Sequence, residues 1–301
     1  MAALAVAITG ATGYLGTHLS RRLVQQGVAV TCLLRTGSES KLATDLQGRV
    51  RVLSTDETPE KLAQGLRDHS VSALLHLATH FVAEHSDASI PLLIESNIAL
   101  GTRIAEATAL AGCQRFLNIG SFWQHFEGEA YSPASLYAAT KKAFEDILHY
   151  YSAVRGLSVI NLKFAAVYGP SDPRAKIINL LFKSAQAQTR LALSGGEQLM
   201  DLIYVDDAVQ AVLAGLKVLE SSAPSSQASF SVSSEQSLSL RNFVQIMEDS
   251  TGQKPPIDWG AKPYRQREFF KDWVFDPPLP NWAPQVTLKD GLKQVFLHFP
   301  N

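Results

Sequence analysis

Short apolar runs that alternate with helical patterns dominate the first half of this sequence. The helical segments repeat apolar residues every three or four positions, as at Leu15, Leu19 and Leu23, and Gly27 ends that segment. This alternation is typical of a parallel sheet covered by helices on both faces. Because right-handed crossovers join parallel strands, it predicts an α/β fold with a doubly wound parallel sheet of Rossmann type. The predicted strands are residues 4–8, 28–34, 50–53, 73–77, 115–119 and 157–162.

Beyond residue 170 the regular alternation ends, and the sequence predicts mixed, loop-rich structure. A serine-rich stretch over residues 220–239 predicts a surface loop, and clustered prolines in the tail favour irregular structure packed on the body. The predicted elements are a helix around residues 177–186, a strand over 199–205, a helix that begins at Asp206 or Asp207, and a short strand at 229–232.

These patterns predict two lobes. We expect residues 1–170, with 199–219 returning to them, to form the Rossmann-type domain. Residues 171–198 and 220–301 are expected to form a smaller C-terminal α+β lobe. A lobe of this kind covers the ligand end of the sheet, so we expect it to bind the substrate.

Charge and composition argue against several functional classes. The 301 residues carry a formal net charge of −1 with scattered basic residues, so neither nucleic acid nor an anionic membrane is an expected partner. No apolar run approaches the ~20 residues that span a bilayer. Residues 1–8 are apolar without a preceding basic segment, which predicts a first strand rather than a signal peptide. Cys32 and Cys113 lie far apart in apolar segments, which predicts reduced buried thiols, no metal site and a cytoplasmic protein.

A glycine-rich turn follows the first predicted strand directly. Gly10, Gly13 and Gly16 have the spacing at which one glycine permits a tight turn, another lets backbone N–H groups approach a pyrophosphate, and the last packs helix against strand. The following helix N-terminus adds partial positive charge. Three glycines alone also occur in structural turns, but their place between strand and helix favours a dinucleotide site. The residues expected around the cofactor here are Gly10, Thr12, Gly13, Tyr14, Leu15 and Gly16.

The end of the second strand indicates which dinucleotide binds. NAD-binding proteins usually place Asp or Glu there to bind the ribose hydroxyls, and that charge repels a 2′-phosphate. This sequence has no acid at that point and carries Arg35, which can grip a phosphate with help from Ser38 or Lys41. We therefore expect NADP(H) rather than NAD, with a merely solvated Arg35 as the alternative. Asp56 is a candidate partner of the adenine amino group, or a helix-capping aspartate.

Tyr137 and Lys141 lie four residues apart in a predicted helix and therefore share one face. An ammonium beside a phenol is expected to lower the phenol pKa from about 10 toward neutrality, and the lysine can also hold the nicotinamide ribose. Ser121 follows the fifth strand at its carboxyl end, where its hydroxyl can orient a substrate oxygen. The structural alternatives are a core tyrosine, a surface lysine and a turn serine. Their combination with the glycine turn favours a catalytic role for all three.

Further motifs are spread over nearly the whole chain. They are Gly10, Gly13, Gly16, His76, Leu77, Ala78, Asn97, Ser121, Tyr137, Lys141, residues 167–170 and residues 201–207. With these motifs the chain resembles the extended short-chain dehydrogenase/reductases of the nucleotide-sugar epimerase, dehydratase and ketoreductase superfamily. The resemblance implies that Tyr137 is the acid in reduction and the base in oxidation, that Lys141 supports it and that Ser121 polarises the carbonyl. It also implies that Leu77 and Ala78 line the cofactor, which owns the hydride chemistry.

The two positions after Ser121 narrow the reaction. Related dehydratases carry Asp and Glu there, and epimerase-reductases carry a cysteine at the second, whereas Phe122 and Trp123 cannot transfer protons in that way. The resemblance is closest to CDP-abequose synthase-like enzymes. It implies NADPH-dependent reduction of the C4 keto group of a nucleotide-linked 4-keto-6-deoxy or dideoxy hexose. The alternatives are an NAD-retaining nucleotide-sugar 4-epimerase, a non-catalytic NADP(H) sensor that binds a partner protein, and a reductase of ketones without a nucleotide.

Substrate contacts follow from the same resemblance. His80 and Trp123 come after strands at the ligand end, with His125 nearby, and a packed aromatic or a surface imidazole is the alternative for each. Asn179 aligns with a helix near which relatives hold the nucleotide sugar. Arg265, or the second arginine two residues later (Arg267), resembles a C-terminal arginine that grips the diphosphate.

Two remaining features concern assembly and one departure from the family. In many relatives the helices that hold Asn97 and Tyr137 pair across a two-fold axis, so we expect a homodimer. Lys163 stands where many relatives carry arginine. The resemblance assigns that lysine no role.

Overall fold

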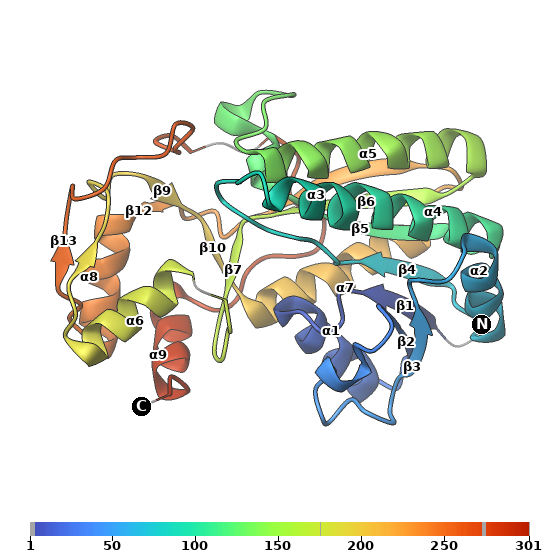
Figure 1. The fold of residues 1–301 in the computed structure, drawn as a ribbon, viewed down its shortest axis with the longest axis horizontal. Coiled ribbons are helices and arrows are strands. Elements are labelled where there is room, and N and C mark those ends of the chain that lie inside the picture. Colours follow the sequence, from blue (N-terminus) through green and yellow to red (C-terminus); the bar gives the residue numbers. More distant parts are fainter. Residues whose placement is uncertain (1–3, 175, 273–274, 301) are drawn as a thin grey trace.

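Seven parallel strands form the main sheet of the computed structural model, which describes residues 4–174, 176–272 and 275–300 (Figure 1). These strands are β1 (Ala5–Thr9), β2 (Ala29–Leu34), β3 (Arg51–Ser54), β4 (Ala73–His76), β5 (Arg115–Ser121), β6 (Ser158–Phe164) and β11 (Gln227–Val232). Their order is β11-β6-β5-β4-β1-β2-β3, so the winding direction reverses between β1 and β4. Ligands of open α/β sheets bind at such a reversal. The predicted doubly wound fold is confirmed.

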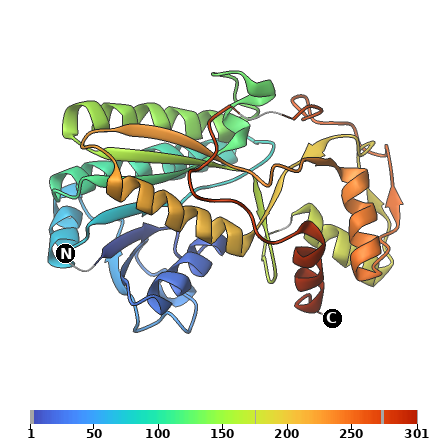
Figure 2. The same ribbon diagram turned by 180° about the vertical axis from the view of Figure 1, so that it is seen from behind.

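Helices cover both faces of this sheet. They are α1 (Tyr14–Gln25), α2 (Pro59–Asp68), α3 (Ser89–Ile94), α4 (Leu100–Leu110), α5 (Leu136–Arg155) and α7 (Val205–Ser221). Figures 1 and 2 show α1 and α7 on one face, and α2, α4 and α5 on the other. Val6 and Ile8 pack under α1 and α7, whereas Ala7 packs toward the opposite helices. Side chains of β1 are therefore buried on both faces, as expected for a parallel sheet.

Local signals determine where several of these helices begin and end. The Thr58 side chain accepts a hydrogen bond from the Lys61 N–H at 3.4 Å, and Pro59 occupies the first position of α2. After α5, Gly156 adopts a left-handed conformation with φ 77°, which a residue with a Cβ rarely adopts. The turn at Gly156 brings the chain back to the start of β6.

The seventh strand, β11, corrects the predicted boundary at residue 220. The sequence placed residues 220–239 in the C-terminal lobe, but β11 pairs with β6 from Gln227 opposite Val159 to Val232 opposite Phe164. The backbone of Ser231 then binds the C-terminal tail, donating to Pro277 O at 2.8 Å. Because β11 is partly exposed, its serines gave it the composition of a loop although its backbone completes the sheet.

A smaller lobe lies beside the carboxyl ends of the strands (Figure 1). It contains α6 (Ile177–Ala187), α8 (Leu240–Thr251), α9 (Leu288–Leu297), β8 (Leu191–Ala192), β9 (Leu199–Met200), β12 (Leu238–Ser239) and β13 (Ile257–Asp258). The strand pair β7 (Ala166–Tyr168) and β10 (Leu202–Tyr204) connects the lobe to the main sheet. Phe182, Phe243 and Leu292 of the lobe belong to the same apolar cluster as α1 and α7. The two lobes therefore share one core.

The predicted strand over 199–205 is divided at Asp201. The Asp201 carboxylate accepts hydrogen bonds from the Ser233 hydroxyl and from the N–H and hydroxyl of Ser234. These bonds separate β9, which pairs with β12, from β10, which pairs with β7. The next helix begins at Val205, and neither predicted aspartate caps it, because Asp207 accepts from the Val286 N–H at 2.9 Å instead.

Candidate active site

The glycine turn leaves no room for side chains at two of its three glycines. A Cβ on Gly10, whose φ is 73°, would lie 2.7 Å from the Ala78 nitrogen, and a Cβ on Gly16 would collide with the Gly10 carbonyl. No side chain caps the N-terminus of α1 at Gly13, which is exposed. The turn is therefore a bare backbone cradle at a helix N-terminus, and this fits a pyrophosphate.

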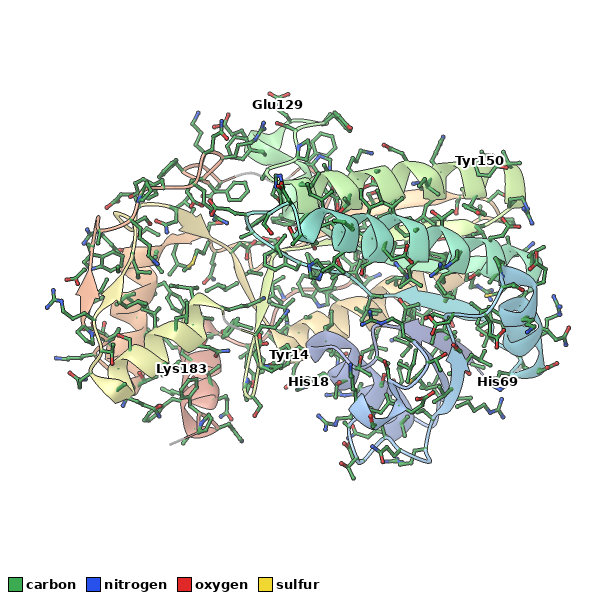
Figure 3. All side chains as sticks on the ribbon, viewed as in Figure 1. Tyr14, His18, His69, Glu129, Tyr150 and Lys183 are labelled. Atoms are coloured by element: carbon green, nitrogen blue, oxygen red, sulfur yellow. The ribbon has the colours of Figure 1, made fainter. Side chains whose placement is uncertain are left out.

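Contacts from neighbouring segments hold the cradle. Leu77 and Ala78 each donate a backbone N–H to the Thr9 hydroxyl at 3.1 Å, which places the end of β4 against the turn. The Tyr14 hydroxyl donates to Pro170 O at 3.0 Å, and its ring contacts His18 edge-on, as both lie at the start of α1 (Figure 3). Burial raises the pKa of Tyr14, so its phenol remains a donor. Thr9 is a residue that sequence reasoning missed, because nothing but its pairing distinguishes it from other strand threonines.

At the far end of the predicted cofactor site, Arg35 is exposed directly after β2. Asp56 binds the same loop, because its Oδ2 accepts from the Thr36 N–H at 2.8 Å. That hydrogen bond lowers the Asp56 pKa, with a smaller contribution from the charge of Arg35. Asp56 therefore shapes the loop that carries Arg35, and its contact with adenine stays a prediction.

Tyr137, Lys141 and Ser121 come together at the carboxyl end of β5. The Ser135 side chain caps α5 by accepting from the Ala138 N–H at 3.3 Å, which places Tyr137 and Lys141 in the first two turns. All three predicted residues are buried, with exposures of 8%, 4% and 9%. The Tyr137 hydroxyl forms hydrogen bonds with the side chains of Ser121 and Thr79. A phenol and a serine hydroxyl can thus bind one substrate oxygen together.

The expected lowering of the phenol pKa by Lys141 is wrong. Burial raises the pKa of Tyr137 to about 12, and the hydrogen bonds with Thr79 and Ser121 only partly oppose it. Burial also lowers the pKa of Lys141 to about 8. Desolvation outweighs charge here because both groups lie within the protein. The phenol is consequently protonated at neutral pH and is ready to donate.

Asn97 organises the loop that carries Thr79. It lies in a π-helical turn, η2 (Glu95–Ala99), between α3 and α4, and is 1% exposed. Its Oδ1 accepts from the Thr79 hydroxyl at 2.9 Å and the His80 N–H at 2.8 Å. Its Nδ2 donates to His80 O at 3.0 Å and to the Thr140 hydroxyl at 2.9 Å. Asn97 thereby holds Thr79 against Tyr137, a link that only the fold reveals.

Aromatic side chains flank Tyr137. The Phe81 ring meets Tyr137 edge-on at 4.9 Å between centroids and lies 5.6 Å from Trp123. Trp123 in turn contacts Phe269 at 5.8 Å, and the guanidinium of Arg265 lies 4.9 Å from the Trp123 ring centre. Two predicted substrate residues, Trp123 and Arg265, are thus neighbours on an apolar wall beside the phenol.

Comparison with known proteins agrees with this geometry. The sequence model described as "NAD dependent epimerase/dehydratase family" matches residues 6–227. The chain belongs to this family. It is an NAD(P)-dependent enzyme of the extended short-chain dehydrogenase/reductase type.

The relatives found by sequence include CDP-abequose synthase from Salmonella typhimurium, 25% identical over 296 residues that cover 96% of each chain. UDP-glucuronate 4-epimerase 1 from Arabidopsis thaliana is 29% identical over 238 residues, which cover 71% of this chain and 55% of the relative. Both of these relatives are named for nucleotide sugars.

Solved structures share the fold. MoeE5 in complex with UDP-glucose and NAD superposes with a TM-score of 0.81 at 23% identity, and 97% of each chain is covered. UDP-glucose 4-epimerase from Brucella ovis in complex with NAD gives 0.82 at 18% identity, covering 99% of this chain and 98% of that one. At these identities the likeness concerns the fold.

Two other residues suggested as substrate contacts form hydrogen bonds within the protein. The Asn179 amide nitrogen donates to the carbonyls of Asp172 and Arg174, each at 2.7 Å. A substrate contact of Asn179, as predicted, would therefore use its amide oxygen. His125, suggested as a sugar or diphosphate contact, is 3% exposed, and its Nδ1 lies 3.1 Å from Glu129 O. Burial and the charge of Lys163 lower the His125 pKa. The fold turns the His125 ring toward Lys163 and Glu129, and its contact with sugar or diphosphate stays a prediction.

The second arginine considered for the diphosphate, Arg267, packs over the Phe126 ring at 4.5 Å and binds the Ser132 hydroxyl. Arg265 instead pairs with Glu268, which is 7% exposed, at the edge of the aromatic wall. Arg265 is therefore the arginine of the two that lies beside Trp123. Arg174 was missed by sequence reasoning, although its charge lowers the pKa of Tyr137 and its guanidinium stacks 4.9 Å from the Tyr14 ring centre.

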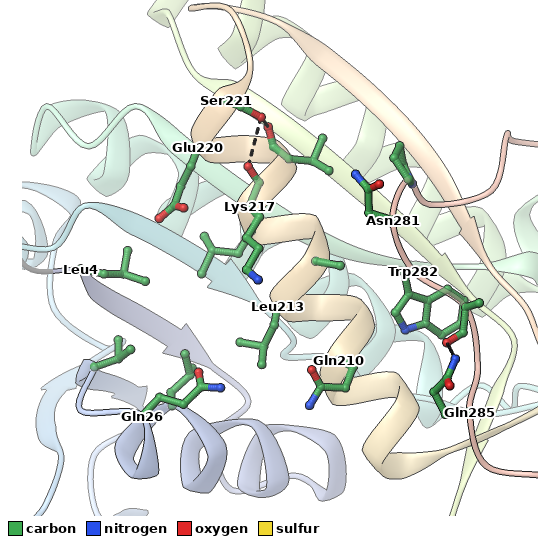
Figure 4. Close-up of a pocket in the computed structure, with 17 residues that line it drawn as sticks. Leu4, Gln26, Gln210, Leu213, Lys217, Glu220, Ser221, Asn281, Trp282 and Gln285 are labelled. Carbon is green, nitrogen blue, oxygen red and sulfur yellow. Dashed lines mark hydrogen bonds between the residues drawn. The ribbon is translucent and has the colours of Figure 1, made fainter.

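A cavity of about 620 Å³ lies away from this site, between α1, α7 and the tail at residues 280–285 (Figure 4). Leu213, Lys217 and Trp282 are among its lining residues, and none of the predicted site residues lines it.

Within the described parts of the chain, no helix has the length and apolar character needed to cross a membrane. Over the same residues, no group of three or more His, Cys, Asp or Glu is arranged to hold a metal ion.

Proposed function

We propose that this enzyme uses NADPH to reduce the C4 keto group of a nucleotide-linked 4-keto-6-deoxy or dideoxy hexose. The observation that carries the proposal is the buried Tyr137 phenol, whose pKa is raised to about 12 and which is hydrogen-bonded to Ser121. A neutral phenol beside a serine hydroxyl is suited to donate a proton to a carbonyl oxygen as that oxygen gains charge.

The residues that would hold the cofactor follow from the glycine cradle. Gly10, Gly13 and Gly16 would bind the pyrophosphate through backbone N–H groups, and Lys141 would hold the nicotinamide ribose. The bound nicotinamide supplies the hydride. Arg35 would bind the 2′-phosphate, and its exposed position after β2, where no acid stands, supports NADPH over NAD.

Side chains of the protein would bind the carbonyl oxygen and supply its proton. Ser121 would donate a hydrogen bond to the carbonyl oxygen, and Tyr137 would donate its proton to the same atom. The positive charge of Arg174 would favour the phenolate left behind. Each of these interactions grows stronger as negative charge develops, which is the requirement for catalysis.

The aromatic wall supports a deoxygenated sugar as substrate. Phe81, Trp123 and Phe269 offer apolar surface beside Tyr137, and buried hydroxyls without partners would be costly there. Phe122 and Trp123 cannot exchange protons with a sugar, so dehydration is disfavoured. Arg265, held by Glu268 at the far side of Trp123, is the group we assign to the diphosphate. These positions support the prediction that the C-terminal lobe binds substrate.

An assay of NADPH oxidation tests the proposed reduction directly. Purified enzyme should oxidise NADPH when given a CDP- or dTDP-linked 4-keto-6-deoxyhexose. Tyr137→Phe, which keeps the ring and removes the proton, should lower kcat by about 10²- to 10⁴-fold. Unchanged turnover in this variant would remove Tyr137 from the mechanism.

A nucleotide-sugar 4-epimerase that retains NAD is the second candidate, because the solved structures of similar fold contain NAD. Denaturing the protein as isolated distinguishes the two candidates. Release of about one NAD per chain supports the epimerase, whereas an empty site that binds NADPH reversibly supports the reductase.

We also propose a cytoplasmic homodimer. Cys32 and Cys113 are both free and buried, as expected where thiols stay reduced. Leu92 of α3 is 52% exposed, and Tyr150 and Val154 of α5 are 54% and 61% exposed, so the two helices present apolar side chains to solvent (Figure 3 labels Tyr150). A molar mass of one chain in dilute solution, measured by light scattering, would contradict the dimer.

A further inference from the structure

Behind Ser121 lies a buried group of charged and polar side chains, here called the Lys163 cluster, made of Gln124, Glu145, Lys163 and Asp276. Lys163 is 2% exposed, Gln124 1% and Glu145 7%, and the Asp276 side chain is 10% exposed. Each residue comes from a different part of the fold: η3 (Phe122–Gln124), α5, β6 and the C-terminal tail. Burying so many polar groups is costly unless each has a partner.

The Lys163 ammonium lies between two carboxylates and an imidazole nitrogen. Its Nζ lies 3.3 Å from Glu145 Oε1, 3.1 Å from Asp276 Oδ2 and 2.5 Å from His125 Nε2. Because burial and Lys163 lower the His125 pKa, that imidazole is neutral and accepts through Nε2 while Nδ1–H donates to Glu129 O. The ammonium is therefore fixed in place by three independent segments.

The cluster extends from Lys163 to the backbone of Ser121. Glu145 Oε2 accepts from Gln124 Nε2 at 2.7 Å, and Gln124 Oε1 accepts from the Ser121 N–H at 2.8 Å. The carboxylate thus determines which end of the Gln124 amide faces Ser121. The Ser121 oxygen in turn accepts from the Trp123 N–H at 3.3 Å, which leaves its hydroxyl hydrogen to donate.

Stability alone does not account for this arrangement, because well-packed apolar residues often replace a buried ion pair without loss. The contacts instead form a path from Lys163 on β6 to Ser121. The Lys163 charge orients the Glu145 carboxylate, which orients the Gln124 amide. That amide in turn holds the Ser121 backbone. Gly120 is part of the same fit, since a Cβ there would lie 2.8 Å from Gln124 Oε1 and 3.1 Å from Lys163 Cγ.

We propose that Lys163 is a positioning residue that holds Ser121 through Glu145 and Gln124. The inference rests on the proposed function in one respect, the assignment of Ser121 to the substrate oxygen. Without the Lys163 ammonium, Glu145 and Asp276 lose the cation that lies between them, and Glu145 keeps the more distant Lys142, whose Nζ lies 3.7 Å from its Oε1. Glu145 then no longer orients Gln124, and Ser121 loses its fixed acceptor.

Hydrogen exchange tests the positioning without any substrate. In Lys163→Met, the amides of residues 121–124 should exchange about tenfold faster or more, while residues 10–16 stay unchanged. Ser229→Ala is the matched control, because the Ser229 hydroxyl contacts Glu145 Oε1 at 3.4 Å but does not touch Gln124 or Ser121. Should Lys163→Met not fold, Gln124→Leu interrupts the same path at a neutral residue. Wild-type exchange at residues 121–124 in a folded variant of either kind overturns the proposal.

A double-mutant cycle tests the path by activity. Lys163→Met should lower kcat by about 10- to 100-fold with little change in the KM for NADPH. In a Ser121→Ala background the same substitution should cost less than about twofold, because the group it positions is already absent. Losses that multiply independently would overturn the proposal. If the wild-type enzyme reduces none of the 4-keto sugars, that result counts against the proposed function, and the exchange measurement still decides the role of Lys163.

Discussion

Replacing Lys141 by methionine should make the cofactor-free protein more stable at neutral pH. Lys141 is 4% exposed, and burial lowers its pKa to about 8 from an ordinary value of 10.5. The unfolded chain therefore binds the lysine proton more tightly than the folded one, which favours unfolding by about 3 kcal/mol at pH 7. Methionine keeps the length of the side chain and removes the charge, so most of this cost should disappear.

The sign of the effect gives a pH signature. The cost is full below the folded pKa of about 8 and vanishes above 10.5, where both states have lost the proton. The stability difference between Lys141→Met and wild type should fall from about 3 kcal/mol at pH 7 to about 2 at pH 9 and less than 1 at pH 10. Urea unfolding followed by tryptophan fluorescence at these pH values measures it.

The neighbouring lysine is the control. Burial lowers the pKa of Lys142. Its hydrogen bond to Asp146 and the charges of Glu145 and Asp146 together raise the pKa by more than burial lowers it, so the net shift is upward. Lys142→Met should therefore lose up to about 1 kcal/mol at neutral pH, and this loss should fade as the pH rises through the raised pKa. A Lys141→Met protein that is less stable than wild type at pH 7, or whose gain persists unchanged to pH 10, would refute the desolvation argument. Saturating NADPH should reverse the order, because wild type alone retains the proposed ribose contact.

Three other changes test separate parts of the site. Arg35→Glu should weaken NADPH binding by about 10- to 100-fold and leave NADH binding within about threefold in a fluorescence titration, so equal losses would count against a 2′-phosphate contact. Thr79→Val removes a hydrogen bond that lowers the Tyr137 pKa, so the pH at which the reverse, oxidising reaction accelerates should rise by about half a unit to one unit, and an unmoved profile would show that Thr79 does not act on the phenol. Gly16→Ala places a Cβ against the Gly10 carbonyl and should cost about 1–3 kcal/mol of stability together with at least tenfold in cofactor affinity, whereas wild-type melting and binding would mean that the turn yields.

Local patterns were enough to predict the framework of the site. Strands buried on both faces need unbroken apolar runs, and the turn after β1 needs glycine where a Cβ meets Ala78 or the Gly10 carbonyl, so both leave a trace in the sequence. The four-residue spacing of Tyr137 and Lys141 likewise follows from helical geometry. These predictions depend on neighbours along the chain, and the sheet order and the meeting of Tyr137 with Ser121 agree with them.

The parallel sheet, the glycine cradle and the residues near the cradle could therefore be predicted from the sequence. The sequence did not reveal that the serine-rich β11 joins the main sheet, that His125 turns inward to Lys163, or that burial raises the Tyr137 pKa instead of lowering it. The physical reason is the same in each case. Strand pairing at an edge, the partner of a buried charge and the loss of water around a phenol depend on residues that are distant in sequence, and no local pattern records them.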